Sequence, residues 1–307
     1  FNRFVLMATV GGRPSVLIDG LISDRQVQPG EQPGTAKLTI TGEDMSLKMD
    51  REEKRETHQA QDITSIVTKI IGRHGLKPVV IPPTYIDAPS PVEEIPSQQG
   101  TDLAYVKRLA DEVGHIFYVS PGKAPGTSTG YWGPPAMTEP PQPALSTNMG
   151  PHTNVESLDF ENDSTSPAMV MTNIIDARTN VEIPVPVLTS MRRALSSNPP
   201  WEGGPGQMRT VALDLSGASI VEALARAQGA VDASMDGAVK ATGSLDVVRY
   251  GRLLEPNGLV GVRGAGHGFD GLYFVDGVTH KIEAGSYKQD FELSREGTGS
   301  SVGSVPV

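Results

Sequence analysis

GSLDVVRYGRLLEPNGLVGVRGAGHGFDGLYFVDGVTHKIEAGSYKQDFELSRE, residues 243–296, is the segment that points most clearly to a fold. It consists of short β-rich runs separated by Gly, Asn-Gly or Asp-Gly breaks, which is typical of consecutive β-hairpins. In the last run a mainly apolar set of side chains alternates with a polar set: Tyr287, Gln289, Phe291 and Leu293 against Lys288, Asp290, Glu292 and Ser294. This period of two indicates a strand with one covered face. We therefore predict a small closed antiparallel β-barrel.

A helix is expected directly before these hairpins. Ser219 and Glu222 fit the S-x-x-E capping box, and the apolar residues that would form the buried side of the helix are Ile220, Val221, Leu224 and Ala225. Residues 211–217 (VALDLSG) alternate as a strand does. We predict a tube-like β-barrel over residues 211–297 that includes a helix over 219–235, followed by a flexible tail over 298–307.

The beginning of the chain has β character as well. FVLMATV leads into the Gly11-Gly12 turn, and Leu38 and Ile40 fall on one face of AKLTITGED. Strand-like composition returns within residues 153–178, which we expect to complete a first tube-like barrel with residues 1–50. Because the chain opens at Phe1 directly on a strand, we expect further strands of this barrel upstream. Residues 179–210 lack clear periodicity and are predicted to be an irregular linker.

Helical patterns lie between these β regions. Asp62 can cap a helix that Gly75 is placed to end, with an apolar stripe made of Ile63, Ile66, Val67, Ile70 and Ile71. A second helix is expected from Thr101 to Gly114, followed by the strand HIFYVSP. The charged run REEKRETH (51–58) is predicted to be a solvated connection, and residues 82–96 a loop. Residues 51–152 are thus predicted to be an inserted α/β domain.

The predicted fold class is mainly β with an α+β insertion: two tube-like antiparallel β-barrels plus an inserted α/β domain. The composition favours small β-rich units, since the 307 residues include 34 Gly and 25 Pro and only 37% are hydrophobic. A formal net charge of −10 provides no basic surface for nucleic-acid phosphates. No apolar stretch approaches the ~20 residues of a membrane span, and the absence of cysteine excludes disulfides and thiolate sites. We expect neither specific nucleic-acid binding nor stable membrane insertion.

No motif in the sequence points to a catalytic or cofactor site. GHGFDG (266–271) matches G-x-G-x-x-G, but a predicted strand follows it instead of the helix that a dinucleotide site requires, so we interpret it as a turn. The histidines are scattered without metal-ligand spacing. Adjacent acidic pairs such as Glu52/Glu53 would diverge on either a strand or a helix. We expect no enzyme activity, catalytic residue, cofactor or metal.

Two tryptophans and two arginines are candidates for contacts. Trp132 and Trp201 lie in Pro/Gly-rich segments that we expect to be loops. We expect Trp132 to pack within its own domain, whereas Trp201 is equally consistent with self-packing and with burial against a partner. Arg249 and Arg263 lie in strand-like runs with few charged neighbours, where an arginine either bridges an interface or lies on a solvated barrel face. The candidate interface residues are therefore Trp201, Arg249 and Arg263.

Several strings, in this order along the chain, resemble the phage late control protein D family. They are LTITGEDMSLKMDREEK (38–54), QGTDLAYVKRLADEVGHIFYV (99–119), YWGP (131–134), LSTNMGPHTNVESLDFEND (145–163) and, near the end, LDVVRYG, LVGVRGAG, DGLYFVDGVTHKI and YKQDFELSREG. They cover most of the chain, and their joint order is more specific than any single string. The family contains baseplate hub proteins of contractile tails and contractile injection systems, and resembles the hub region of VgrG-like proteins.

The resemblance implies a structural protein of a baseplate. Two tube-like barrels in each chain would let a homotrimer present six barrels around a channel and adapt a six-fold tail tube to a three-fold spike. The inserted domain would then be peripheral. The implied partners are tail-tube or tube-initiator proteins, a separate spike protein and other baseplate proteins. The implied location is the virion tail, or the baseplate of an injection particle that is assembled in the cytoplasm or acts outside the cell.

Two other functions stay open from the sequence. One is a cell-wall hydrolase at a tail tip with residues 52–160 as its catalytic part, because carboxylates that converge from separate elements cannot be seen in a sequence. The other is a soluble carbohydrate- or protein-binding module that uses the tryptophan segments as its contacts.

Overall fold

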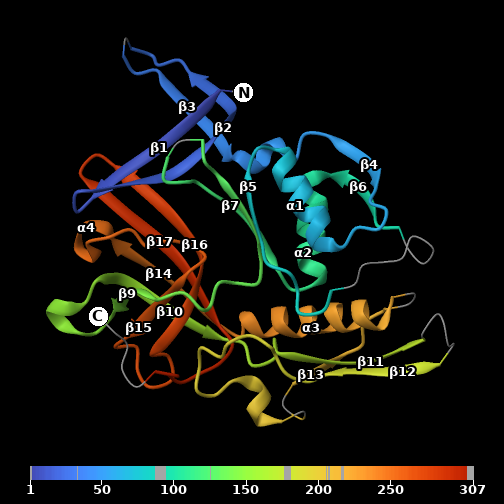
Figure 1. Cartoon of the computed structure of the whole chain (residues 1–307). Helices are drawn as coiled ribbons and strands as arrows, with labels where there is room; N and C mark the ends of the chain where they lie inside the picture. Colours follow the sequence, from blue (N-terminus) through green and yellow to red (C-terminus); the bar gives the residue numbers. More distant parts are fainter. Residues whose placement is uncertain are drawn as a thin grey trace. The chain divides into compact units, whose positions relative to one another are not determined.

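The computed structural model describes residues 2–32, 34–86, 95–124, 126–175, 181–204, 206, 208–215 and 218–302. The described chain is mainly β with curled sheets and a smaller helical content, which confirms the predicted fold class (Figure 1). Its contacts divide it into two compact units. The first contains Phe1–Asp111 and His115–Gly133, and the second contains Glu112–Gly114 and Pro134–Val307.

The first unit begins with an antiparallel sheet in the order β1 (Arg3–Val10), β2 (Arg13–Gln28) and β3 (Lys37–Asp44). Gly11 and Gly12 connect β1 to β2 with positive φ angles, which glycine adopts without strain. Asp19 of β2 is 2% exposed and accepts hydrogen bonds from the Arg3 guanidinium and from the Gly126 amide (2.8 Å). The bond from Arg3 lowers the pKa of Asp19 although burial opposes it. This buried carboxylate ties the loop around Gly126 to the sheet.

The helices of the first unit form where the sequence predicts them. Asp62 caps α1 (Ile63–Arg73) by accepting from the amides of Thr64 and Ser65, and the buried residues of α1 are Ile66, Val67, Ile70 and Ile71. α2 (Asp102–Glu112) buries Asp102, Tyr105, Val106, Leu109 and Ala110. The strands beside them are β5 (Lys77–Val80), β8 (Thr129–Gly133) and β7 (Ile116–Ser120) in one sheet, and β4 (Glu53–Thr57) paired with β6 (Ser97–Thr101) in another. The turn η1 (Met45–Lys48) follows β3.

Trp132 is fully buried in this unit. Its Nε1 donates to the Val106 carbonyl of α2 (3.2 Å), and its ring meets that of His115 edge-on. The prediction that Trp132 packs within its own domain is therefore confirmed. The prediction that it lies in a loop is wrong, because β5 and β7 pair with TGYWG on both sides and hold it extended despite its glycines.

The second unit is built on a six-stranded sheet in the order β10-β14-β17-β16-β15-β9. Its strands are β9 (Gln142–Ser146), β10 (Val155–Asn162), β14 (Val239–Asp246), β15 (Leu259–Arg263), β16 (Gly271–Glu283) and β17 (Ser286–Arg295). All neighbours are antiparallel except β15 and β9. The alternation in β17 has the predicted consequence, since Gln289, Phe291 and Leu293 are buried. Short 3-10 turns lie at η2 (Gly150–His152) and η3 (Pro200–Gly203).

The GHGFDG segment connects β15 to β16, which confirms that it is a turn between strands. The buried guanidinium of Arg295 holds this loop by donating to the carbonyls of Gly268 (2.7 Å) and Asp270 (3.1 Å). The same group stacks over the Tyr273 ring, 4.3 Å from its centroid. Arg295 of β17 thus fixes the loop between β15 and β16 against the sheet.

A second sheet of this unit has the order β12 (Glu182–Val187), β11 (Ala168–Ile175) and β13 (Arg209–Val211). α3 (Ile220–Asp236) packs against β11 and β12, as Figure 1 shows. The predicted N-terminus of this helix is confirmed, because Ser219 accepts from the Glu222 amide (3.1 Å). The shared core includes Met169, Val170, Ile174, Val185, Ala223, Ala227 and Val231.

The strand partners of residues 153–178 differ from the expectation. β10 pairs with β14 and β11 pairs with β12 and β13, whereas β1, β2 and β3 pair with one another. β9, which lies within the predicted insertion, pairs with β15. Alternation predicts that a segment is a strand but not which strand it pairs with, because every sheet has the same period. The division into two barrels at the predicted boundaries stays a prediction.

The segment predicted to be an irregular linker, 179–210, contains the strand β12 and most of β13. The prolines in EIPVPV disfavour a strand on local grounds, but an edge strand tolerates them because one side of its backbone needs no partner. We predicted a strand over 211–217, but β13 ends at Val211. The prediction is therefore wrong for residues 212–215, which the structure describes. Residues 87–94, 176–180, 205, 207, 216 and 217 lie outside the described residues.

The end of the described chain is held in place, so the flexible tail predicted from residue 298 is wrong for residues 298–302. Thr298 forms a bridge with Asn198, and Ser301 Oγ donates to the Leu195 carbonyl (2.7 Å). The buried Glu296 carboxylate accepts from the amides of Leu195 and Ser196 (2.7 Å each) and from Ser196 Oγ (2.8 Å). Residues 303–307 lie outside the described residues.

Glu296→Ala is expected to destabilise this C-terminal attachment by roughly 3 kcal/mol, because it leaves buried amides without their charged acceptor. Glu296→Gln keeps one acceptor oxygen and is the matched control, with a loss of about 1 kcal/mol. Hydrogen exchange at the Leu195 and Ser196 amides measures the effect directly. Unchanged protection of both amides in Glu296→Ala would show that the carboxylate does not hold them.

Gly229 of α3 is expected to be intolerant of a side chain. A Cβ at this position would lie 2.4 Å from the Val113 carbonyl carbon and 2.5 Å from the Gly114 nitrogen. Alanine normally stabilises a helix interior by about 1 kcal/mol relative to glycine, but overpacking costs roughly 1–3 kcal/mol, so the clash should win. Gly72→Ala in α1 is the control, because its Cβ meets nothing within 4 Å. Thermal unfolding should therefore show a lower Tm for Gly229→Ala and an equal or higher Tm for Gly72→Ala.

Candidate functional site

The far half of the β2–β3 hairpin has an apolar face that is exposed in the described chain. Val27, Leu38 and Ile40 lie on it, with 66%, 58% and 52% of their surface exposed. The register places Val27 opposite Leu38 and Arg25 opposite Ile40, so these side chains point to the same side. The other face is polar and carries Asp24, Gln26, Gln28, Lys37, Thr39 and Thr41. Such a hairpin has the amphipathic pattern of a sheet with one covered face.

A second exposed apolar face lies on the β11–β12 hairpin of the other unit. Met171 and Ile175 are 51% and 62% exposed, and Met171 lies opposite Pro186. β12 is an edge strand whose Pro184 and Pro186 have no N–H group, which hinders the addition of another strand. A partner at this hairpin would therefore pack on its face.

The three candidate interface residues lie on separate elements of the second unit. Trp201, in η3, is half-buried against the core of its own unit, which is one of the two alternatives that the sequence left open. Arg263 ends β15, and its Nε donates to Ser146 Oγ (2.7 Å). Arg249 is exposed in the short helix α4 (Val247–Tyr250), so its assignment to a strand-like run is wrong. Asp246 caps this helical turn by accepting a hydrogen bond from the Arg249 amide (2.9 Å). An interface role for Trp201, Arg249 and Arg263 stays a prediction.

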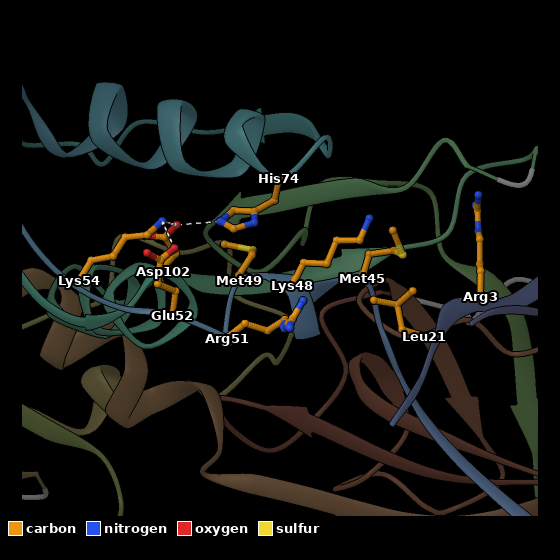
Figure 2. A pocket seen from close by; sticks show the side chains of 10 residues that line it. All are labelled: Arg3, Leu21, Met45, Lys48, Met49, Arg51, Glu52, Lys54, His74 and Asp102. Atoms are coloured by element: carbon orange, nitrogen blue, oxygen red, sulfur yellow. Dashed lines mark hydrogen bonds and ion pairs between the residues drawn. The ribbon is translucent and has the colours of Figure 1, made fainter. Parts of the chain in front are cut away.

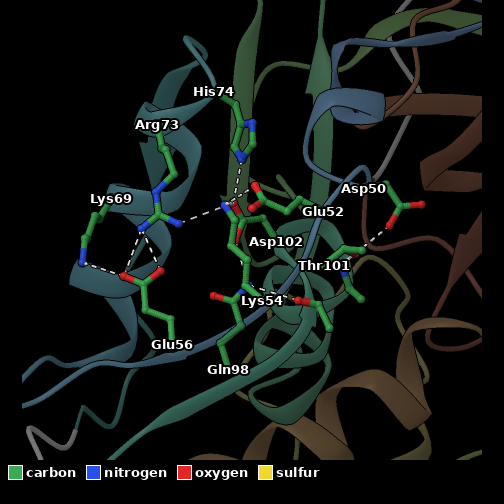
Figure 3. Close-up of polar contacts among 12 residues, drawn as sticks. Asp50, Glu52, Lys54, Glu56, Lys69, Arg73, His74, Gln98, Thr101 and Asp102 are labelled. Carbon is green, nitrogen blue, oxygen red and sulfur yellow. Dashed lines mark hydrogen bonds and ion pairs between the residues drawn. The ribbon is translucent and has the colours of Figure 1, made fainter.

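Figure 3 shows a cluster of charged side chains around Asp102 in the first unit. Asp102 is 1% exposed, and its Oδ2 accepts from Lys54 Nζ of β4 and His74 Nε2 at the end of α1, each at 2.7 Å. Its Oδ1 accepts from Gln98 Nε2 of β6, also at 2.7 Å. Arg73 lies 3.6 Å from Oδ2. One buried carboxylate therefore connects two strands and the two helices.

The hydrogen bonds set the ionisation of Asp102. Burial by itself would raise the pKa of this carboxyl group, but the bonds from Gln98, Lys54 and His74 outweigh it and lower the pKa from 3.8 to about 2. The group is therefore ionised at neutral pH and holds no proton that it could donate as a general acid. The position of Asp102 suits it to holding the neighbouring side chains of Lys54, Arg73 and His74 in place.

A cavity of about 750 Å³ opens beside this cluster (Figure 2). Basic side chains from several elements line it: Arg3, Lys48, Arg51, Lys54 and His74. Leu21, Met45 and Met49 supply apolar surface. The acidic residues of the lining are Asp102 and Glu52. The Glu52 side chain is exposed, and its carboxylate lies 3.9 Å from Lys54 Nζ. The cavity is thus more basic than the acidic chain that contains it.

This cluster was not predicted, because REEKRETH was interpreted from the sequence as a solvated connection. The structure pairs most of that run as β4 with β6, and Lys54, Glu56 and His58 alternate toward the less exposed side. His58 is 1% exposed and stacks on Tyr105, with 5.8 Å between ring centroids. Glu56 accepts from Lys69 (3.3 Å) and Arg73 (3.0 Å) of α1. The period of two within the charged run was the signal that could have revealed the strand.

Within the described ranges, no three or more His, Asp or Glu side chains gather as metal ligands would. His115 packs against Trp132, and His280 Nδ1 lies 2.9 Å from the Tyr287 hydroxyl. In that same part of the chain, no helix has both the length and the apolar character needed to cross a membrane.

Known family models do not match this sequence, and no curated protein matches it either. Solved structures do match. A 43 kDa tail protein of prophage MuSo2 from Shewanella oneidensis aligns with a TM-score of 0.63 at 15% identity, over 95% of this chain and 82% of that one. A tail protein from Neisseria meningitidis MC58 aligns with a TM-score of 0.61 at 16% identity, over 93% of this chain and 82% of that one.

A third similar structure comes from a secretion system. It is a type VI secretion component from E. coli, described as similar to the T4 bacteriophage tail proteins gp27 and gp5. It aligns with a TM-score of 0.58 at 15% identity, over 99% of this chain and 66% of that one. At these identities the likeness concerns the fold. The chain therefore has the fold of phage tail proteins and of their relative in type VI secretion.

Proposed function

We propose that this protein is a structural baseplate hub of a contractile phage tail or contractile injection system. Three copies form a ring that adapts the six-fold tail tube to a three-fold spike. The fold shared with two phage tail proteins and a type VI secretion component supports this structural role. The location that follows is the tail or the baseplate of the particle.

The observation that carries the assembly is the amphipathic β2–β3 hairpin. Its apolar face has three large side chains that are more than half exposed, while its opposite face is polar. Burial of an apolar side chain stabilises by about 1.5–3 kcal/mol, so covering this face with a neighbouring copy is favourable. Closed cyclic symmetry limits such an assembly to a defined number of copies. The β11–β12 face, Trp201, Arg249 and Arg263 are further contacts that we place in the ring or against baseplate proteins.

The partners that we propose are tail-tube or tube-initiator proteins on one side of the ring and a separate spike protein on the other. A net charge of −10 disfavours tight binding of DNA, so nucleic acid would pass the ring without adhering to it. The protein itself is not an enzyme in this proposal.

Mass photometry of the purified chain, alone and with its genomic neighbours from the same tail or injection cluster, tests the proposal. We expect either a trimer of the chain alone or, when the partners are added, a complex that contains three copies of the chain. A protein that stays monomeric in every mixture would contradict the ring. A turbidity assay on purified peptidoglycan separates the hydrolase alternative, since any clearing that depends on the protein would overturn the non-enzymatic role.

A further inference from the structure

The apolar face of the β2–β3 hairpin carries one positive charge. Arg25 of β2 lies opposite Ile40, on the same side of the hairpin as Val27 and Leu38. All four side chains are exposed in the described chain. A charge that is buried without a partner is costly. A surface that covers this face is therefore expected to bring apolar side chains together with an acceptor for one guanidinium group.

The apolar face of the β11–β12 hairpin carries one negative charge. The cross-strand pairs on this face are Met171 with Pro186, Asn173 with Pro184, and Ile175 with Glu182. Directly opposite residues point to the same side of an antiparallel pair, and all of these side chains are exposed in the described chain. Asn173 Nδ2 donates to the Glu182 carboxylate (2.7 Å), which can accept further hydrogen bonds. This face thus combines apolar surface with an exposed carboxylate.

A ring of three copies needs two different contact faces on each copy. In a cyclic trimer the copies meet head to tail, so the face that touches one neighbour differs from the face that touches the other. Each of the two compact units of the chain has one of the apolar hairpin faces described above. Their opposite charges favour contact between the two faces, whereas either face paired with itself would bring like charges together.

We propose that the β2–β3 face of one copy packs on the β11–β12 face of the next copy in the ring. The apolar side chains of the two faces cover each other, and Arg25 pairs with Glu182 of the neighbouring copy. Pro184 and Pro186 remove N–H groups from the edge strand β12, so the hairpins meet face to face and not as neighbouring strands of one sheet. This inference rests on the proposed trimeric ring and identifies the surface that covers its β2–β3 hairpin.

Exchange of the two charges tests this docking. Arg25→Glu places two carboxylates against each other at every interface of the ring, and Glu182→Arg places two guanidinium groups there. We expect each single variant to weaken assembly roughly tenfold or more, and Arg25→Glu/Glu182→Arg to restore it to within about threefold of the parent. Analytical ultracentrifugation measures the association. Lys37→Glu, on the polar face of the same hairpin, is the matched control and should change it less than about twofold.

Cysteine cross-linking locates the contact, because the chain contains no cysteine of its own. Leu38→Cys and Met171→Cys are prepared as separate variants, mixed before assembly and treated with a short bis-maleimide. We expect a covalent dimer in the mixture and in neither variant alone, since the two faces of a head-to-tail contact are different. Thr39→Cys, on the polar face, replaces Leu38→Cys in the control mixture and should not cross-link.

The outcomes separate this docking from the ring itself. A ring that forms without the cross-link, or a double exchange that assembles no better than the single variants, would overturn the docking and leave the ring standing. A cross-link in Leu38→Cys alone would show contact between identical faces and would also overturn it. A parent chain that never assembles would contradict the ring and, with it, the docking.

Discussion

Leu38→Glu/Ile40→Glu is expected to prevent assembly of the ring while the single chain stays folded. Both side chains are more than half exposed in the described chain, so their replacement costs little stability in the monomer. In the ring they would be buried, and each loss removes about 1.5–3 kcal/mol of apolar burial before the cost of burying charge. Together these losses correspond to a decrease in association of roughly a hundredfold to more than ten-thousandfold. Analytical ultracentrifugation over a concentration series measures it.

The matched control for this prediction is Gln28→Glu/Thr39→Glu. These residues lie on the same two strands and introduce the same charge, but on the polar face. The carboxylate that Gln28→Glu introduces would also lie opposite Lys37, so the control gains a favourable cross-strand pair. Assembly should survive in this variant. A ring that persists in Leu38→Glu/Ile40→Glu, or that is lost equally in the control, would contradict the assignment of the apolar face.

Removal of the Asp102 carboxylate is the second large effect that we expect. Asp102→Ala leaves Lys54 and His74 without their shared acceptor, and the loss of one partner from a buried ion pair costs about 3–5 kcal/mol. The Lys54 side chain is 19% exposed and can turn toward water, so we expect a loss of stability near about 3 kcal/mol. Trp132 is buried in the same unit, so its fluorescence in a Trp201→Phe background follows urea unfolding there. A change below about 1 kcal/mol would mean that the cluster contributes nothing essential.

The lowered pKa of Asp102 predicts a pH dependence of stability. Its folded pKa of about 2 lies below the ordinary value of 3.8, so the stabilisation is fully present above about pH 4 and is lost as the pH falls toward 2. At about 1.36 kcal/mol per pKa unit, the shift corresponds to roughly 2 kcal/mol. Asp102→Asn cannot titrate and should therefore lose less stability between pH 5 and pH 2.5 than the parent does. Identical pH profiles would contradict the assignment.

The sequence predicted those elements whose signals are local. Asp62 and Ser219 cap their helices as expected, and the alternation in β17 places Phe291 and Leu293 in the core. The strand β12 was hidden by its prolines, and α4 was hidden because VVRY has the composition of a strand. In that case the cap provided by Asp246 outweighs β propensity over a single turn. Local propensity determines whether such a short segment becomes a strand or a helix only when no helix cap or neighbouring strand favours the other structure.

The site residues were harder to predict, because their chemistry depends on contacts that are distant in sequence. Lys54 meets Asp102 across 48 positions, and His74 meets it across 28. Neither pair has a spacing that marks a motif, and a charged run is ordinarily solvated. The apolar face of β3 was visible as alternation of Leu38 and Ile40, but whether anything covers it depends on the three-dimensional structure. The contacts of Trp201 likewise became apparent only from the core against which it packs.

Electron cryomicroscopy of the assembled particle would image the proposed ring itself. We expect three copies of this chain in a closed ring around the axial channel, between the tail tube and the spike, with the β2–β3 apolar face buried between copies. A single copy, or copies attached at the periphery away from the axis, would contradict the proposed hub.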